Sequence, residues 1–305
     1  MDVVISALLS IETLINAAFN PSSINNYVIP MNRLEKVQGQ LSHPRKFEYT
    51  VDGGCLTLEQ REFYEENGFL VIRKFLKDDS IEKWKKRFIE YCDKKVDPLP
   101  GMQIVRDISL VKAGGKNAIG EAAITKVQDF QDDEELYTFC NNPDLVPYLK
   151  SFCGPNIKSV HTMFINKPPF MGSSSRHPFH QDLAYFPFRP ANRIVAAWAS
   201  LEDATKENGS LNIFPKTHKG EFLRHIYPEW EGKVNKAYFG IDNYDQAKFE
   251  RIDLEMKKGD IVFFHPLLIH GSGENKTTGY RKVKLSYNVV NVLPFRRCCL
   301  QLHRH

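Results

Sequence analysis

The sequence lacks the features that mark several classes of protein. Its six cysteines form no Cys-x-x-Cys pair and follow no regular spacing, which argues against a disulfide scaffold and favours free thiols in a reducing compartment. The formal net charge is only +4 and the lysines and arginines form no cluster, so we expect no nucleic-acid partner. No internal repeat is visible. A composition of 42% hydrophobic and 26% charged residues is that of an ordinary soluble globular protein.

Also absent is an apolar run long enough to span a bilayer. Residues 3–19 are mostly apolar, but Glu12 interrupts them, and a membrane helix needs about 20 consecutive apolar residues. Asp2 stands where a secretory signal peptide carries positive charge. We therefore expect neither a signal peptide nor a membrane partner.

Residues 33–41 carry a different kind of signal. Arg33-Leu34, five further residues and Gln40-Leu41 form a pattern that resembles the type-2 peroxisomal targeting signal, which an import receptor reads. We therefore predict that residues 1–45 are an N-terminal extension, that the protein is peroxisomal, and that Met31 is the working start.

Helical patterns come first in the chain and strand patterns follow. Thr57 and Gln60 form a capping box ahead of a short helix that Gly68 ends. The predicted helices are 57–67, 78–93 and 143–153, and a strand is predicted at 69–75. Segments rich in β-branched and aromatic residues predict further strands at 158–167, 193–202, 209–215, 259–270 and 281–291. This order predicts an α+β fold with a double-sheet β core of the jelly-roll or cupin type, flanked by N-terminal helices.

The stretch 176–189 holds the first candidate metal ligands. His180 and Asp182 are separated by one residue, and on an extended strand their side chains leave the same face, within reach of one ion. His270 ends the apolar segment 259–270, where a strand would deliver its last side chain to the mouth of a barrel. Two imidazoles and one carboxylate form the facial triad of non-haem Fe(II) oxygenases, but zinc hydrolases also combine these ligands. The triad alone therefore leaves the metal open.

Arg281 favours iron together with a 2-oxoacid. It stands eleven residues after His270, and the Gly- and Asn-containing turn between them predicts that 259–270 and 281–291 are neighbouring strands of a hairpin. The guanidinium would then enter the same cavity and pair bidentately with the distal carboxylate of 2-oxoglutarate. A zinc hydrolase is further disfavoured because no general-base glutamate lies beside the candidate ligands.

Other side chains near the ligands are expected to point away from the site. His177 precedes His180 by three positions and His265 precedes His270 by five, so both should lie on the opposite faces of their strands. Gln181 stands between the first two ligands, so it should also face away and support the strand.

The stretches LTLEQREFYEENGFLVI, SRHPFHQDLAYFPFRP and KGDIVFFHPLLIHGSGENKTTGYRK closely resemble the phytanoyl-CoA dioxygenase family, and the likeness runs from about residue 46 to residue 284. The resemblance implies a double-stranded β-helix fold and dependence on Fe(II), 2-oxoglutarate and ascorbate. It also implies that a 3-methyl-branched acyl-CoA reacts with O2 and is hydroxylated at carbon 2, in the peroxisomal α-oxidation of fatty acids.

The resemblance also assigns individual residues. Carried over position by position, it makes His180, Asp182 and His270 the iron ligands. The residues that it assigns to 2-oxoglutarate are Lys126, Met163, Trp198, Ser272 and Arg281. We take 46–291 as the catalytic domain and 292–305 as a tail unlike the family. Two alternatives stay open: the same chemistry on a different substrate, and a catalytically weak or inactive truncated homologue.

Overall fold

The computed structural model describes residues 46–107, 118–169, 175–227, 238–245 and 249–290. Contacts divide the chain into two units, Met1–Pro44 and Arg45–His305, and every described residue belongs to the second. The predicted targeting signal, the predicted start and the tail 292–305 lie outside the described residues. Within the described ranges, every helix is too short or too polar to cross a bilayer.

The first described helix, α2 (Leu58–Asn67), agrees with the predicted helix 57–67. Thr57 is its N-cap: the Thr57 hydroxyl accepts from the Gln60 N–H, and the Gln60 side chain accepts from the Thr57 N–H. Two donors that the helix cannot pair are thereby satisfied. Gly68 ends the helix in the left-handed region at φ 78°. The chain continues directly into β1 (Phe69–Ile72), which is shorter than the predicted strand 69–75.

Helices α3 (Asp78–Cys92) and α5 (Leu145–Cys153) confirm the other two helical predictions. Their buried apolar side chains form one cluster with side chains of the larger sheet. The ring of Phe88 in α3, for example, stacks on Phe164 of the sheet with ring centroids 4.2 Å apart. Burial of these apolar faces against the sheet holds both helices in place.

The larger sheet contains seven strands in the order β1–β11–β6–β13–β4–β3–β2, each antiparallel to its neighbours. Its strands besides β1 are β2 (Gln103–Arg106), β3 (Ile124–Gln128), β4 (Ile157–Lys167), β6 (Ile194–Ser200), β11 (Ile261–Phe264) and β13 (Arg281–Val290). Strand β6, in the interior of this sheet, is buried on both faces. Val195, Ala197 and Ala199 belong to the cluster with the helices, whereas Ala196 and Trp198 belong to a second cluster. Because side chains alternate along a strand, this sheet separates two apolar cores.

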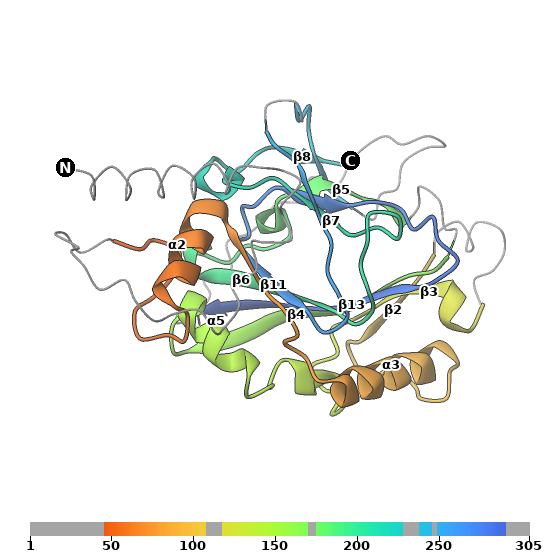
Figure 1. The fold of residues 1–305 in the computed structure, drawn as a ribbon. Coiled ribbons are helices and arrows are strands. Elements are labelled where there is room, and N and C mark those ends of the chain that lie inside the picture. The colour runs from red at the N-terminus through yellow and green to blue at the C-terminus, as the bar shows by residue number, and fades with distance from the viewer. Residues whose placement is uncertain (1–45, 108–117, 170–174, 228–237, 246–248, 291–305) are drawn as a thin grey trace, which may run out of the picture. The chain divides into compact units, whose positions relative to one another are not determined.

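A four-stranded sheet, in the order β10–β7–β12–β5, packs on the second core, so the helices and the smaller sheet cover opposite faces of the larger sheet (Figure 1). Its strands are β5 (His177–His180), β7 (Leu211–Ile213), β10 (Ile252–Leu254) and β12 (His270–Ser272), and a separate pair is β8 (His225–Ile226) and β9 (Gly240–Ile241). The 3-10 turns are η2 (Glu121–Ala123), η3 (Leu136–Phe139), η5 (Asp182–Ala184), η6 (Ala191–Arg193) and η7 (Thr217–Lys219). Two packed antiparallel sheets with helices on one outer face confirm the predicted fold class.

The segment 259–270 is not one strand, contrary to the prediction. Strand β11 ends at Phe264, and a turn follows in which the Leu268 N–H donates to the His265 carbonyl at 2.9 Å. Pro266 within that turn has no N–H to offer a ladder, so the strand cannot continue. The chain then enters the other sheet as β12. The predicted hairpin is therefore wrong, because β12 pairs with β5 and β7 whereas β13 pairs with β4 and β6.

Candidate metal centre

Two of the three candidate ligands come from the end of β5. His180 is the last residue of that strand, but Asp182 begins the 3-10 turn η5 and is not on the strand as predicted. The residue between them, Gln181, keeps an extended backbone with φ −113° and ψ 128°. The alternation of an extended chain therefore persists through Gln181, and both ligand side chains leave the same side.

The Gln181 side chain points away from the ligands, as predicted, and is fully buried. Its amide nitrogen donates to the carbonyls of Glu221 and Leu267 at 3.1 and 3.0 Å, and its oxygen accepts from the Leu223 N–H at 2.8 Å. These bonds fasten the segment that carries His180 and Asp182 to two loops that are distant in the sequence.

His270 is the first residue of β12 rather than the last residue of a long strand. In the antiparallel pairing of β12 with β5, it lies directly opposite His180. Directly opposed side chains share one face of a sheet, and the two imidazole centroids are 4.3 Å apart. The pairing of two strands thus brings the histidines together.

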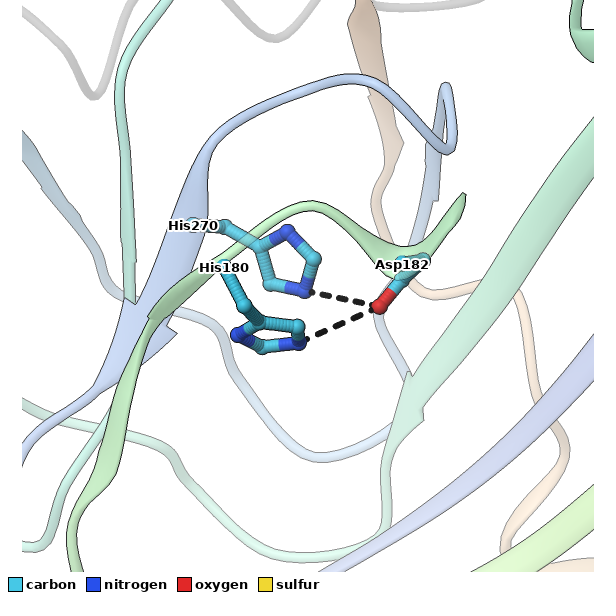
Figure 2. A group of neighbouring side chains, drawn as sticks. All are labelled: His180, Asp182 and His270. Atoms are coloured by element: carbon cyan, nitrogen blue, oxygen red, sulfur yellow. Dashed lines mark ion pairs between the residues drawn. The ribbon is translucent and has the colours of Figure 1, made fainter. Parts of the chain in front are cut away.

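The three side chains converge on one point (Figure 2). Asp182 Oδ1 lies 3.2 Å from His180 Nε2 and 3.5 Å from His270 Nε2. One nitrogen or oxygen from each residue lies within 4.8 Å of the others, and all three residues are buried. One metal ion could therefore contact all three groups.

Hydrogen bonds to the backbone fix the tautomers of the two histidines. His180 Nδ1 donates to the Pro178 carbonyl and His270 Nδ1 donates to the Leu268 carbonyl, both at 2.9 Å. A carbonyl can only accept, so each Nδ1 carries the proton and each Nε2 presents its lone pair to the site. Burial lowers the pKa of His270 to about 4, although the charge of Asp182 acts to raise it. This imidazole is therefore neutral at neutral pH, as a metal ligand must be.

The Asp182 carboxylate is buried and ionised. Burial acts to raise its pKa, but the two imidazoles outweigh burial and hold the pKa below its usual value. Neither oxygen is exposed to solvent, and neither accepts a hydrogen bond of good geometry from a described residue; their polar neighbours are the two imidazoles and the Tyr287 hydroxyl. A buried carboxylate without hydrogen bonds is destabilising unless a cation binds it. The donor set therefore fits a divalent metal ion.

His180 and His270 line a small cavity of about 80 Å³ between the two sheets. A single buried water needs about 10–15 Å³, so this cavity has room for a small molecule and not for a large one. Its lining includes all the residues that the resemblance assigned to 2-oxoglutarate, namely Lys126, Met163, Trp198, Ser272 and Arg281. Lys167 and Arg176 add two further cations, and no aspartate or glutamate of the described chain is among the lining residues. The lining is suited to an anion.

Arg281 is a buried guanidinium without a counter-ion. It is 2% exposed, and within the described ranges its hydrogen bond runs from Nη2 to the Gly209 carbonyl at 2.9 Å while Nε has no partner. Burial, which Glu202 opposes, lowers its pKa to about 9, so it remains cationic at neutral pH. Because β13 belongs to the larger sheet and β12 to the smaller one, Arg281 and His270 reach the cavity from opposite sheets rather than from one hairpin.

His177 does not point away from the site, and the prediction for it is wrong. It lines the cavity, and its ring stacks on that of His180. Along the strand pair, His270 lies opposite His180 and Ser272 lies opposite His177, so three steps on β5 match two on β12. The additional residue is a β-bulge, which turns one side chain to the other face. His265 does lie outside the cavity lining, beside Tyr49 and His218.

Comparisons with known proteins agree with this arrangement. Residues 64–283 match the phytanoyl-CoA dioxygenase (PhyH) family. The chain belongs to this family. It is 53% identical over 241 residues to the peroxisomal phytanoyl-CoA dioxygenase of Homo sapiens, covering 79% of this chain and 70% of that protein. It is 50% identical over 239 residues to the probable phytanoyl-CoA dioxygenase of Caenorhabditis elegans, covering 77% and 76%. The predicted family and the predicted class of enzyme, a dioxygenase, are thereby confirmed.

Solved structures share the fold of this phytanoyl-CoA dioxygenase family member at low sequence identity. EctD from S. alaskensis in its apoform has a TM-score of 0.61 and 15% identity and covers 79% of each chain. SnoK, a non-heme alpha ketoglutarate dependent carbocyclase from nogalamycin biosynthesis, has a TM-score of 0.57 and 18% identity, over 77% of this chain and 84% of that chain. At such identities the likeness concerns the fold, and it agrees with the two-sheet core described above.

Lys167 and Tyr287 are among the cavity residues of this phytanoyl-CoA dioxygenase family member that escaped prediction. Both lie on strands whose alternation could have identified them. Lys167 stands four residues after Met163 on β4, and Tyr287 stands six residues after Arg281 on β13. Residues separated by an even number of positions lie on the same face of a strand. Lys167 therefore shares a face with Met163, and Tyr287 shares one with Arg281, both of which were already assigned to the cavity.

Proposed function

We propose that this chain catalyses the Fe(II)- and 2-oxoglutarate-dependent 2-hydroxylation of a 3-methyl-branched acyl-CoA of the phytanoyl-CoA type. One observation carries the proposal: two imidazoles and a carboxylate converge at a cavity into which an unpaired guanidinium projects from the facing sheet. The identity of 53% to a human protein named for phytanoyl-CoA supports the substrate.

His180 Nε2, His270 Nε2 and Asp182 Oδ1 would hold the iron. Such a triad occupies one face of an octahedron and leaves the other face for a bidentate 2-oxoacid and O2. When bound, the iron supplies the oxidative chemistry, in which decarboxylation of 2-oxoglutarate to succinate and CO2 is coupled to insertion of one oxygen atom at carbon 2. The backbone carbonyls that accept from both Nδ1 atoms keep the imidazoles in the ligating tautomer.

The remaining cavity residues would bind and orient 2-oxoglutarate. Arg281 offers its unpaired Nε–H to the distal carboxylate, and Ser272 adds a hydroxyl at the same cavity. Met163 and Trp198 form apolar walls, which exclude water from the reacting groups. Lys126 adds positive charge to the lining, where a dianion needs it.

The cavity is too small for an acyl-CoA, so the substrate has to approach from a neighbouring space. A larger cleft of about 660 Å³ shares Arg176, His177 and Ser272 with the cavity. We propose that the acyl chain lies along this cleft and that its carbon 2 reaches the metal beside His177. The cleft also presents Lys206 and Arg251, which could contact phosphate groups of the substrate.

Product analysis tests this proposal. The purified chain would be incubated with Fe(II), 2-oxoglutarate and phytanoyl-CoA, with and without ascorbate, which we expect to keep the iron ferrous. Mass spectrometry should detect the 2-hydroxyacyl-CoA and an equal amount of succinate. Straight-chain acyl-CoAs in parallel test the alternative that another substrate is preferred. A protein that binds Fe(II) and 2-oxoglutarate but yields no product would instead be the weak or inactive homologue.

We also propose that the protein acts in the peroxisome and that an import receptor binds residues 33–41. The relatives from human, rat, mouse and cow are named peroxisomal, which supports the location. A fluorescent protein fused behind residues 1–45 should enter peroxisomes, and the Arg33→Ala variant of that fusion should stay in the cytosol. Equal distribution of the two fusions would refute the assignment of the signal.

A further inference from the structure

Lys167 is a buried lysine to which the proposed reaction assigns no role. It is the last residue of β4, it pairs in register with Arg281 of β13, and it is 5% exposed. Its side chain lines the cavity together with His180, His270 and Arg281. A fully desolvated lysine is rare in proteins unless a specific partner holds it.

The partners of Lys167 are acceptors at the start of the loop after β12. Its Nζ donates to Ser272 Oγ at 2.8 Å and also to the carbonyl of Gly273. Gly209 packs against the contact between Lys167 and Gly273. Its φ is +88°, and a Cβ added to it would lie 2.5 Å from the Gly273 carbonyl oxygen. The Gly209 carbonyl also accepts a hydrogen bond from Arg281 Nη2. One turn and one loop therefore hold Lys167 and Arg281 at a fixed spacing.

The bond from Lys167 constrains the hydroxyl of Ser272. In this contact Lys167 Nζ is the donor and Ser272 Oγ is the acceptor. The hydroxyl proton of Ser272 then has to be donated elsewhere, and no described residue accepts it. The hydroxyl is open to the cavity, which Ser272 lines together with Arg281.

We propose that Lys167 is a positioning residue that makes the cavity selective for a dicarboxylate. It holds Ser272 so that the hydroxyl proton and the Arg281 guanidinium both point at the distal carboxylate of the co-substrate. This inference rests on the proposed function, in which that co-substrate is 2-oxoglutarate.

The charges around Lys167 agree with this role. Burial, followed by the nearby cations Arg281 and Lys126, lowers the pKa of Lys167 well below its usual value, and only Glu274 acts in the opposite direction. His177 on β5 also feels the charge of Lys167. Lys167, Arg281 and Lys126 thus repel one another, and a bound dianion relieves this repulsion more than a monoanion does.

Binding of two ligands to the Mn(II)-loaded protein, measured by titration calorimetry, tests the inference. The first ligand is 2-oxoglutarate, and the second is 2-oxopentanoate, which keeps the 2-oxoacid group but lacks the distal carboxylate. We expect Lys167→Met to weaken 2-oxoglutarate binding at least tenfold and to leave 2-oxopentanoate binding unchanged. Lys167→Arg should recover part of the loss. A Lys167→Met variant that weakens both ligands equally, or neither, would overturn the inference.

Ser272→Ala provides a second variant, which applies even where Lys167→Met does not fold. It should show the same selective loss, and the double variant should be no weaker than either single variant because both remove one interaction. A Ser272→Ala variant that loses affinity for both ligands by one factor would overturn the inference. If the unsubstituted protein itself fails to bind 2-oxoglutarate, the proposed function is wrong, and the inference that rests on it is wrong as well.

Lys284 offers a matched control on the same strand as Arg281. Like Lys167 it is fully buried, and burial lowers its pKa well below the usual value. Its Nζ donates to the Leu136 carbonyl and lies among the rings of Trp84, Phe130 and Phe139, away from the cavity lining. Lys284→Met should leave the affinity for 2-oxoglutarate unchanged within twofold. A loss as large as that of Lys167→Met would mean that any buried lysine matters, and would overturn the inference.

Discussion

The ring of His177 lies parallel to that of His180, with centroids 4.1 Å apart and planes 18° from parallel, although the two residues are three positions apart on one strand. The bulge between β5 and β12 creates this contact. On its other side His177 contacts Tyr238, with ring centroids 4.4 Å apart. His177 therefore forms a wall that keeps His180 in its orientation.

Replacing His177 tests this contact. His177→Ala removes the wall, so His180 gains rotamer freedom, and we expect the affinity for Fe(II) to fall about tenfold, as it does when other groups that orient metal ligands are lost. His177→Phe retains a flat ring at the same place and should stay within about threefold of the original affinity. Metal titration of both variants checks the prediction. Equal losses in the two variants would show that His177 acts through its nitrogen atoms and not through stacking.

Metal removal should change the stability of the protein. Because both Asp182 oxygens are buried and have only two imidazoles and the Tyr287 hydroxyl as polar neighbours, the charge of Asp182 is poorly compensated in the metal-free protein. A metal ion at 100 times its Kd should add about 2.7 kcal/mol to the free energy of unfolding, which corresponds to roughly 5–10 °C in Tm. Scanning fluorimetry with Mn(II) measures this shift.

Asp182→Ala is the control for that measurement. It should abolish the metal-dependent shift while leaving the Tm of the metal-free protein unchanged or higher, because a buried unpaired carboxylate has been removed. A metal-dependent shift that survives in Asp182→Ala would place the metal elsewhere.

The parts of the fold that depend on local physics could be predicted from the sequence. The capping box at Thr57 and Gln60 marks the start of α2, and Gly68 in the left-handed region marks its end. The predicted limits of this helix are therefore correct. The uninterrupted apolar run of β6 likewise indicates a strand that is buried on both faces. In each of these cases the residues that decide the structure are close together in the sequence.

The parts that depend on which strands pair could not be predicted in this way. Pro266 could have shown that β11 ends early, but nothing local shows that the chain then enters the other sheet, and so His270 was placed at the end of β11 rather than at the start of β12. Arg281 does reach the same cavity, but from the opposite sheet and not through the expected hairpin. The bulge at His177 arises from a mismatch between two strands, which neither strand reveals alone.

Acid should destabilise the fold through two buried histidines outside the metal centre. Burial lowers the pKa of His218 to about 4, and burial together with the charge of His218 lowers that of His265 to about 3. The unfolded chain titrates near 6.5, so it binds more protons than the folded protein below that pH. The free energy of unfolding should therefore be constant above about pH 6.5 and fall between 6.5 and 4, by at most about 1.4 kcal/mol per pH unit for each histidine.

His265→Asn tests the acid prediction without removing a needed acceptor. His265 Nδ1 accepts from the Leu267 N–H two residues on, at 3.2 Å, and an asparagine side chain can accept from the same position as an Asx turn. Urea unfolding at several pH values between 7 and 4 should show a smaller slope in this variant than in the parent. An unchanged slope would assign the acid sensitivity to groups other than His265.

Gly68 and Gly53 make a matched pair that separates backbone strain from packing. Both have positive φ, 78° and 75°, so alanine at either position costs about 1–2 kcal/mol of stability through the left-handed backbone alone. A Cβ at Gly53 meets nothing within 4 Å, whereas a Cβ at Gly68 would lie 2.4 Å from His218 Nδ1. His218 is buried and its Nε2 donates to the Glu65 carbonyl at 3.1 Å, so the ring cannot retreat without losing that bond. Gly68→Ala should therefore be less stable than Gly53→Ala by a further 2 kcal/mol or so, as overpacking of a tight core usually costs. Denaturant unfolding of the two variants measures the difference, and equal losses would mean that the His218 side chain moves aside freely.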